Sequence, residues 1–402
     1  MNNIEEGKKF HHCTSCQMCS AICPTNAIEI QLNKEGFYRP VVHQDKCIHC
    51  GLCQNVCYQY DGAIKVQDCI DSAYAAWAKD KQLLKQTTSG AIAAILAQQC
   101  LKQGYYVAGV SYDYTKNIAT SVLIKTEEDL EKIKGSKYIQ SYTKEAFQQI
   151  IQDTSEQKYV IFGLPCHIYA FSKMAEIKKQ RSKYILIDLF CHGCPTMNLW
   201  KKYITKVKKD KRLNKVDEVE FRAKDKGWHE FCIKIQENQK KYLDHKTNPF
   251  YTLFFSNLIL NECCVDCKLR STLAYTDIRL GDFWGEKYDT NVEGVSAVAI
   301  CTESGKTIWQ SILQDIHFEP QDLQAIIKNQ SYGDVYEIDK KVREKLLGLL
   351  ADDEQDLKVA KKYYCSTLSR KQKWKGKVKL VISFLPKGVK NKIRKSYHRK
   401  KQ

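Results

Sequence analysis

Short apolar runs alternate with amphipathic segments through the middle of the chain. The apolar runs predict buried strands at residues 105–110, 119–126, 159–163, 184–190, 277–280 and 295–301. The amphipathic segments predict helices at 89–101, 127–134, 144–152, 197–209, 249–260, 305–313 and 320–328, and residues 216–221 and 231–236 predict an antiparallel pair of strands. This alternation indicates an α/β or mixed α+β body.

The first sixty residues carry a different pattern, an internal repeat of cysteines. The segment from Cys13 to Cys23 has the spacing C-x2-C-x2-C-x3-C, and the segment from Cys47 to Cys57 repeats it. In this spacing three thiolates surround one iron–sulfur cubane and the fourth reaches the neighbouring cluster. We therefore predict one [4Fe–4S] cluster on Cys13, Cys16, Cys19 and Cys57, and a second on Cys23, Cys47, Cys50 and Cys53.

A pair of tetrahedral zinc sites is the alternative, because zinc also takes four thiolates. Zinc modules usually space their ligands as two separated pairs, whereas three thiols at this close spacing crowd a larger inorganic core. Pro24 follows Cys23, as in bacterial two-cluster ferredoxins, and Tyr58 replaces proline after Cys57. The module resembles those ferredoxins over residues 10–60, and the resemblance implies electron transfer.

Length and composition place the chain among folded proteins of two or three domains. It has 402 residues, of which 43% are hydrophobic and 27% charged. The polar segment Met1–Phe10 lacks the apolar core of a signal peptide, and no apolar run reaches the roughly 18 residues of a membrane span. We therefore expect a cytoplasmic protein whose nineteen cysteines are reduced or bound to metal.

Most of the positive charge lies at the C-terminal end. Residues 366–402 hold fourteen Lys or Arg and no Asp or Glu, in a chain whose net charge is +18. Lys371–Pro386 interleaves cations with apolar residues and Trp374, which suits an anionic membrane surface. A peripheral position at the inner face of the membrane and a solvated tail both stay open. Nucleic acid is the least favoured partner, because positive and negative charges nearly balance in the rest of the chain.

Six further cysteines occur in three short contexts in the body. They are Cys166, then Cys191 and Cys194, then Cys263, Cys264 and Cys267. Two of these contexts follow predicted strands, and loops at the carboxyl edge of a sheet commonly build sites. The pattern indicates a further metal centre, with buried structural thiols as the alternative.

Several short motifs occur in a specific order along residues 1–310. They are Thr87–Gly90, Gly135–Tyr138, Leu164–Cys166, Cys191–Gly193, Cys264-x-x-Cys267 and Asp277–Gly285. In this order they resemble the coenzyme F420 hydrogenase/dehydrogenase beta-subunit family, fused to an N-terminal two-cluster ferredoxin. Similar proteins occur in anaerobic bacteria, often beside polysaccharide-synthesis genes, and many of those hosts are not expected to make coenzyme F420.

The resemblance implies an iron–sulfur oxidoreductase that contains FAD or another flavin. By position, Cys166, Cys191, Cys264 and Cys267 would ligate a third [4Fe–4S] cluster. Cys194 and Cys263 stand where the family pattern has other residues, so they are either bystanders or substitute ligands.

Two motifs are candidates for flavin contacts. Ser89 and Gly90, at the start of an apolar helix, can present donors to a phosphate, with an ordinary helix N-cap as the alternative. Lys137 and Tyr138 offer a cation and an aromatic face to a flavin or an anionic substrate, or else form a surface loop. Residues 282–284 can line the same pocket or form a buried aromatic corner. No standard dinucleotide or P-loop signature occurs.

The sequence therefore predicts four parts. They are a ferredoxin-type domain at 1–65, a beta-subunit-like domain at 73–330, a helical extension at 331–365 and a basic tail at 366–402. We expect electrons to pass between the ferredoxin-type clusters and a flavin and substrate site, with a redox partner protein or a small molecule as donor or acceptor. A non-catalytic electron-transfer subunit docked on a partner oxidoreductase is the alternative, and a redox-sensing regulator is a weaker third. No catalytic residue is assigned.

Overall fold

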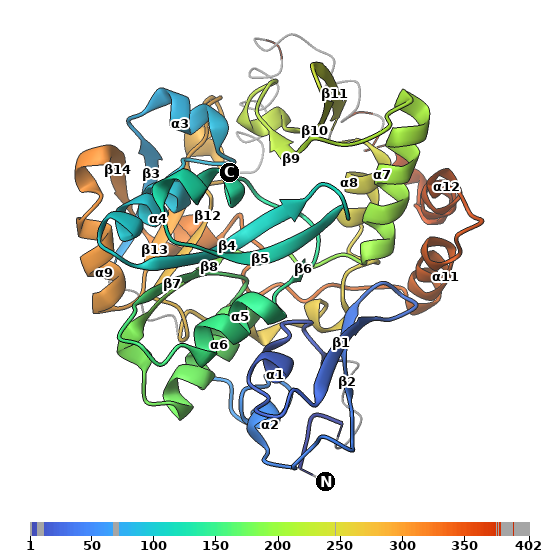
Figure 1. Cartoon of the computed structure of the whole chain (residues 1–402). Helices are drawn as coiled ribbons and strands as arrows, with labels where there is room; N and C mark the ends of the chain where they lie inside the picture. Colours follow the sequence, from blue (N-terminus) through green and yellow to red (C-terminus); the bar gives the residue numbers. More distant parts are fainter. Residues whose placement is uncertain are drawn as a thin grey trace.

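A nine-stranded mixed sheet organises the body in the computed structural model, which describes residues 2–5, 12–66, 72–245, 247–374, 376, 378 and 389 (Figure 1). Its strands are β3 (Ser72–Ala78), β4 (Tyr106–Asp113), β5 (Ile118–Ile124), β6 (Ser141–Tyr142), β7 (Tyr159–Phe162), β8 (Tyr184–Leu189), β12 (Ile278–Asp282), β13 (Ser296–Ile300) and β14 (Ile316–Gln321). They lie in the order β14-β3-β13-β12-β8-β7-β4-β5-β6.

The four central strands β4, β7, β8 and β12 are parallel neighbours in chain order. Helices α4 (Ile92–Lys102) and α9 (Glu303–Gln310) cover one face of the sheet, and α5 (Lys144–Gln152) and α6 (Pro165–Ile177) cover the other. Side chains of one strand alternate between these two cores, because successive residues of a strand point to opposite faces. Because β7 and β8 are parallel, their carboxyl ends lie at the same edge of the sheet.

The N-terminal module lies against that part of the body (Figure 1). It consists of the hairpin β1 (Ile28–Leu32) and β2 (Tyr38–Val42) with the short helices α1 (Met18–Ala21) and α2 (Leu52–Asn55). Met18 and Val56 share an apolar core with Ile168 and Phe171 of α6. The module thus buries apolar surface against the helices that cover the sheet.

Three buried amide side chains, Gln17, Gln140 and Asn261, fasten the module to the body. Each makes hydrogen bonds across the boundary at donor–acceptor distances of 2.8 to 3.3 Å. Their partners across the boundary are Ser141, Thr143 and Lys144 for Gln17, Gly36 and Tyr38 for Gln140, and Cys13, Ser15 and Arg39 for Asn261. Gln140 also donates to the carbonyl of Pro195 within the body. Because each amide is held at both its oxygen and its nitrogen, the module has a defined orientation.

A second layer of elements lies beside the sheet. The antiparallel sheet β11-β10-β9 is formed by β9 (Glu218–Ala223), β10 (Cys232–Glu237) and β11 (Lys240–His245). It shares a core with α7 (Met197–Lys211), α8 (Pro249–Phe254), α11 (Lys340–Ala351) and α12 (Leu357–Thr367). The short helices α3 (Lys81–Gln86) and α10 (Leu323–Ile327) lie elsewhere in the body, and residues 370–374 are also helical.

Three predicted helices differ from the observed elements. The helix predicted at 249–260 ends at Phe254, and Asn257 beyond it takes a left-handed conformation with φ of 64°. The helix predicted at 320–328 contains only Leu323–Ile327, because Pro320 belongs to β14, an edge strand where a missing N–H is tolerated. Residues 127–132 form a 3₁₀-helix instead of the predicted α-helix.

The basic tail predicted at 366–402 lies largely outside the described residues. Within the part that is described, Trp374 is exposed. None of the helices in the described ranges combines the length and apolar character needed to cross a membrane.

Candidate functional site

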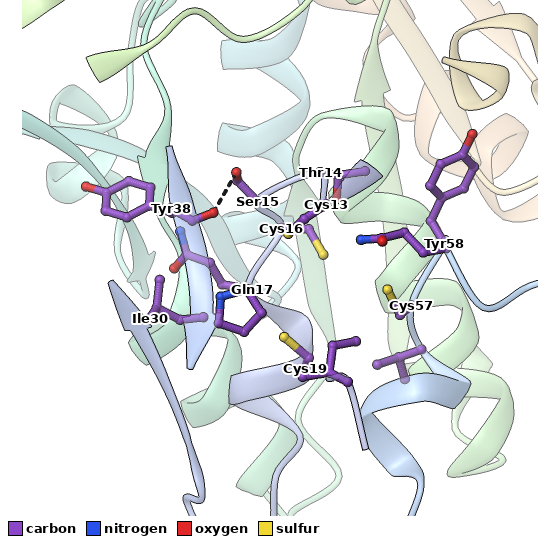
Figure 2. A pocket seen from close by; sticks show the side chains of 14 residues that line it. Cys13, Thr14, Ser15, Cys16, Gln17, Cys19, Ile30, Tyr38, Cys57 and Tyr58 are labelled. Atoms are coloured by element: carbon purple, nitrogen blue, oxygen red, sulfur yellow. Dashed lines mark hydrogen bonds between the residues drawn. The ribbon is translucent and has the colours of Figure 1, made fainter. Parts of the chain in front are cut away.

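The first thiol set, Cys13, Cys16, Cys19 and Cys57, lines a cavity in the N-terminal module with about 450 Å³ of empty space, part of it open to solvent (Figure 2). Figure 2 shows the sulfur atoms of Cys16, Cys19 and Cys57 facing a shared space. The loop that carries the first three thiols is tight, because Ser15 and Gln17 both have a φ of 63°. The Ser15 hydroxyl donates to the carbonyl of Tyr38 at 2.9 Å and holds this loop on β2.

The second thiol set, Cys23, Cys47, Cys50 and Cys53, lines a separate cavity with about 320 Å³ of empty space, part of it open to solvent. Its loop is also tight, with positive φ at His49 and Gly51. Each cavity thus combines three thiols of one repeat with the fourth thiol of the other, which is the grouping that the spacing predicts. The assignment of these thiols as ligands stays a prediction.

Burial and mutual repulsion hold the thiols of the first thiol set in their neutral form. Burial raises the pKa of Cys19 well above its usual value, and the neighbouring thiols raise it further. Four such thiolates need a strongly positive inorganic core, and binding one releases protons. Among the described residues, no group of three or more Cys, His, Asp or Glu converges closely enough to hold a single metal ion.

The third thiol set, Cys166, Cys191, Cys194, Cys263, Cys264 and Cys267, gathers at the carboxyl edge of the central strands. Cys166 follows β7, and it lies in the first turn of α6 and not in a loop as the sequence predicts. Cys191 and Cys194 follow β8. The backbone N–H of Cys194 donates to Sγ of Cys264 at 3.5 Å, and Sγ of Cys263 lies 4.0 Å from that sulfur. The fold therefore brings all six thiols together, including the four predicted ligands.

The first and third thiol sets are direct neighbours. Burial raises the pKa of Cys166 well above its usual value, and the nearby Cys16 adds to the rise. Tyr58 lies between the two sets. Burial raises its pKa to about 12, with a contribution from Cys267, and its ring packs edge-on against Tyr169 at 6.0 Å. The residue that replaces the ferredoxin proline is therefore part of this boundary.

Ser89 and Gly90 are engaged within the protein. The Ser89 hydroxyl donates to the carbonyl of Val295 at 2.9 Å, and the Gly90 N–H donates to the Ser296 hydroxyl at 3.0 Å. Helix α4 begins only at Ile92, after Ala91 in a left-handed conformation, so Ser89 is not its N-cap. These two donors therefore serve the packing of the loop on β13.

Gly90→Ala is expected to lower the free energy of unfolding by about 1–3 kcal/mol, the usual cost of forcing extra atoms into a packed core. A Cβ at residue 90 would lie 2.6 Å from the backbone nitrogen of Ser296 and closer still to the carbonyl oxygen of Ala76. Urea denaturation measures the change. Gly104→Ala is the positional control for a glycine with open space, although its φ of +81° adds strain of its own. An unchanged midpoint for Gly90→Ala would contradict the close packing.

The loops of the two predicted flavin motifs are adjacent. The N–H of Ser136 donates to the Thr88 hydroxyl at 2.9 Å. Lys137 Nζ donates to the carbonyl of Lys134 at 2.7 Å, and burial lowers the pKa of Lys137 to about 7. Burial raises the pKa of Tyr138, and Cys191 of the third thiol set is among its electrostatic neighbours. Lys137 and Tyr138 thus form a partly buried segment next to the thiols, not a plain surface loop.

Sequence reasoning missed the residues on the other side of Tyr138. Arg222 of β9 forms an ion pair with Asp282, and Trp228 Nε1 donates to the same carboxylate at 2.7 Å. Trp284 stacks on Trp228 with ring centres 5.0 Å apart and planes at 9°. Residues 282–284 therefore belong to an aromatic corner, which is one of the two alternatives from the sequence. Its partners Arg222 and Trp228 come from the segment Phe221-Arg-Ala-Lys-Asp-Lys-Gly-Trp228, whose mixture of cations and aromatic residues could have pointed to them.

Comparisons with known proteins agree with this geometry. The 4Fe-4S dicluster domain model matches residues 12–59. The models of the coenzyme F420 hydrogenase/dehydrogenase beta subunit match residues 73–148 with the N-terminal part and 156–325 with the C-terminal part. A comparison with curated proteins gave no match.

Thirteen chains of solved structures also match. One belongs to a structure described as a xenon derivatization of the F420-reducing [NiFe] hydrogenase complex from Methanosarcina barkeri. It is 19% identical, the match covers 72% of this chain and 89% of that chain, and the TM-score is 0.46. The family models confirm the resemblance expected from the motifs: the chain belongs to the coenzyme F420 hydrogenase/dehydrogenase beta-subunit family and carries a 4Fe–4S dicluster domain in its N-terminal module.

Proposed function

We propose that the protein is a flavin-dependent iron–sulfur oxidoreductase that passes electrons between the N-terminal module and a substrate site on the body. One observation carries the proposal, the adjacency of the thiol sets. Cys16 of the first thiol set neighbours Cys166 of the third, and Cys191 of the third neighbours Tyr138. These neighbours link the module to the loop of Lys137 and Tyr138.

The residues present fit the cofactors of this proposal. The first and second thiol sets would each hold one [4Fe–4S] cluster, and Cys166, Cys191, Cys264 and Cys267 would hold a third. When bound, the clusters supply one-electron transfer and the flavin exchanges one-electron for two-electron chemistry. Sγ of Cys263 lies 4.0 Å from Sγ of Cys264, and the thiol of Cys194 is an electrostatic neighbour of Cys264, so these two are the candidates for substitute ligands.

For the flavin, we propose Lys137 and Tyr138 as contacts. Both are partly buried and lie beside the third thiol set. Ser89 and Gly90 would contribute by shaping the adjacent loop, since the Ser89 hydroxyl and the Gly90 N–H already have protein acceptors. The protein's part is then to hold the flavin next to the thiols and to set the charge around it.

The test is the content of iron, acid-labile sulfide and flavin in the full chain purified without oxygen. We expect about twelve iron, about twelve sulfide and about one flavin per chain. About eight iron without flavin would instead leave an electron-transfer subunit that acts only with a partner oxidoreductase, the alternative favoured by the family's description as a beta subunit. Zinc in place of iron would remove the redox proposal.

The substrate and partner in this proposal come from the family resemblance, and the membrane contact comes from the basic tail. Sugar substrates of polysaccharide synthesis are the first to screen, and a redox partner protein is the first partner to seek. Binding of the full chain to vesicles with and without anionic lipid tests the proposed membrane contact of residues 366–402, whose charge is wholly positive.

A further inference from the structure

Arg222 has a hydrogen-bonding edge that the described residues leave unused. The side chain is buried, and the residue is 5% exposed. Its Nη1 bonds to Asp282 and, at 3.4 Å, to the Tyr138 hydroxyl. Its Nε and Nη2 are also buried, and neither has a partner within the described ranges. These two nitrogens form the side of the guanidinium that donates two parallel N–H bonds to a planar acceptor.

Arg279 shows how the same edge is used elsewhere in this protein. Its Nε donates to one carboxylate oxygen of Asp188 at 2.7 Å, and its Nη2 donates to the other at 2.5 Å. Both residues are buried, like Arg222. A carboxylate thus fills the edge of Arg279, while the matching edge of Arg222 is left without an acceptor. Buried donors are rarely left unpaired, so the edge points to a ligand that accepts from both nitrogens.

The surroundings of Arg222 favour a negatively charged ligand with a flat part. The guanidinium lies 4.4 Å from the ring centre of Phe231 and 5.1 Å from that of Trp284, and both side chains are partly exposed. Lys224 is an electrostatic neighbour of Arg222 and donates to the carbonyls of Leu84 and Ser89. Burial lowers the pKa of Lys224 to about 7, so below that pH Arg222 and Lys224 both carry positive charge next to the carboxylate of Asp282.

We propose that Arg222 binds an oxyanion, a carboxylate or phosphate group carried by the flavin or by the substrate, through Nε and Nη2. This assigns an anionic group to the ligand of the site described above, and it rests on the proposed function for the role of that ligand. The binding itself does not involve electron transfer, so the two proposals can fail separately.

The test titrates benzoate and inorganic phosphate into the full chain, purified without oxygen, by isothermal titration calorimetry. Flavin and iron are measured on the same samples. Arg222→Lys keeps the positive charge and removes the bidentate pair of donors, Nε and Nη2. We therefore expect at least about tenfold weaker anion binding, or a loss of bound flavin from the purified protein. Weaker anion binding with unchanged flavin assigns the oxyanion to the substrate, and loss of flavin assigns it to the cofactor.

Arg279→Lys is the matched control, because it removes the same edge from an equally buried arginine whose acceptor is Asp188. Equal flavin content and equal anion affinity in the wild type, Arg222→Lys and Arg279→Lys would overturn the proposal. If Arg222→Lys does not fold, the melting temperature of the flavin-free wild type decides. A melting temperature that rises more in benzoate or phosphate than in sodium chloride of equal ionic strength supports the site. Identical melting temperatures in these solutions overturn the proposal. Anion binding in a sample without iron would leave this site standing while the proposed function fails.

Discussion

Cys166→Ser is expected to remove about four of about twelve iron atoms per chain and to leave the N-terminal clusters intact. Cys166 stands in the first turn of α6 beside Cys16, so it joins the third thiol set to the first. Its loss also interrupts the only proposed route to the flavin, and reoxidation by the substrate should fall to background. Iron content and electron paramagnetic resonance of the reduced protein measure the loss of one cluster out of three.

Cys100→Ser is the matched control for this prediction, since Cys100 is a buried thiol of α4 in the apolar core and belongs to none of the thiol sets. Its iron content should stay at the wild-type value. Cys194→Ser and Cys263→Ser report on the two extra thiols: unchanged iron identifies bystanders, and a loss like that of Cys166→Ser identifies ligands. About twelve iron in Cys166→Ser would show that another thiol takes its place, and about eight in both the wild type and the variant would show that the third cluster is absent.

Arg279→Met is expected to lower the free energy of unfolding by about 3–5 kcal/mol, the largest effect on stability that we anticipate. The substitution leaves Asp188 buried at 1% exposure without its bidentate partner. The pair joins β8 to β12, and the loop of Cys191 follows β8. Denaturation in guanidinium chloride measures the change.

An exposed ion pair supplies the contrast. Lys81 and Glu293 lie 2.7 Å apart with side chains 63% and 37% exposed, and Lys81→Met should change the free energy of unfolding by about 0–1 kcal/mol. Equal losses for Arg279→Met and Lys81→Met would mean that burial does not decide the strength of the pair at Asp188.

The sequence predicted the parts of the fold whose pattern is local. Strands β7 and β8 are short continuous apolar runs, and α5 has a clear amphipathic period, so their positions agree closely with the observed Tyr159–Phe162, Tyr184–Leu189 and Lys144–Gln152. The grouping of the eight N-terminal cysteines into two cavities also follows from local spacing. The domain limits stay a prediction.

Features that depend on long-range contacts could not be predicted in this way. Pro320 reads as the start of a helix, but its place at the sheet edge is set by pairing with the distant β3. Arg222 lies just beyond the strand predicted at 216–221, and only the fold brings it to Asp282, sixty residues later. Cys166 likewise lies near Cys16 only because the N-terminal module packs on the body, and no local sequence pattern specifies that packing.

The hydrogen bonds made by the side-chain amides of Gln17, Gln140 and Asn261 have a consequence for the rate of electron transfer. A redox domain on a loose tether delivers electrons by diffusing between donor and acceptor, and its rate falls as the solvent becomes more viscous. Here the bonds to Ser141, Gly36 and Cys13 clamp the module in place. Electrons that pass from the first to the third thiol set would tunnel across a constant gap, at a rate independent of viscosity.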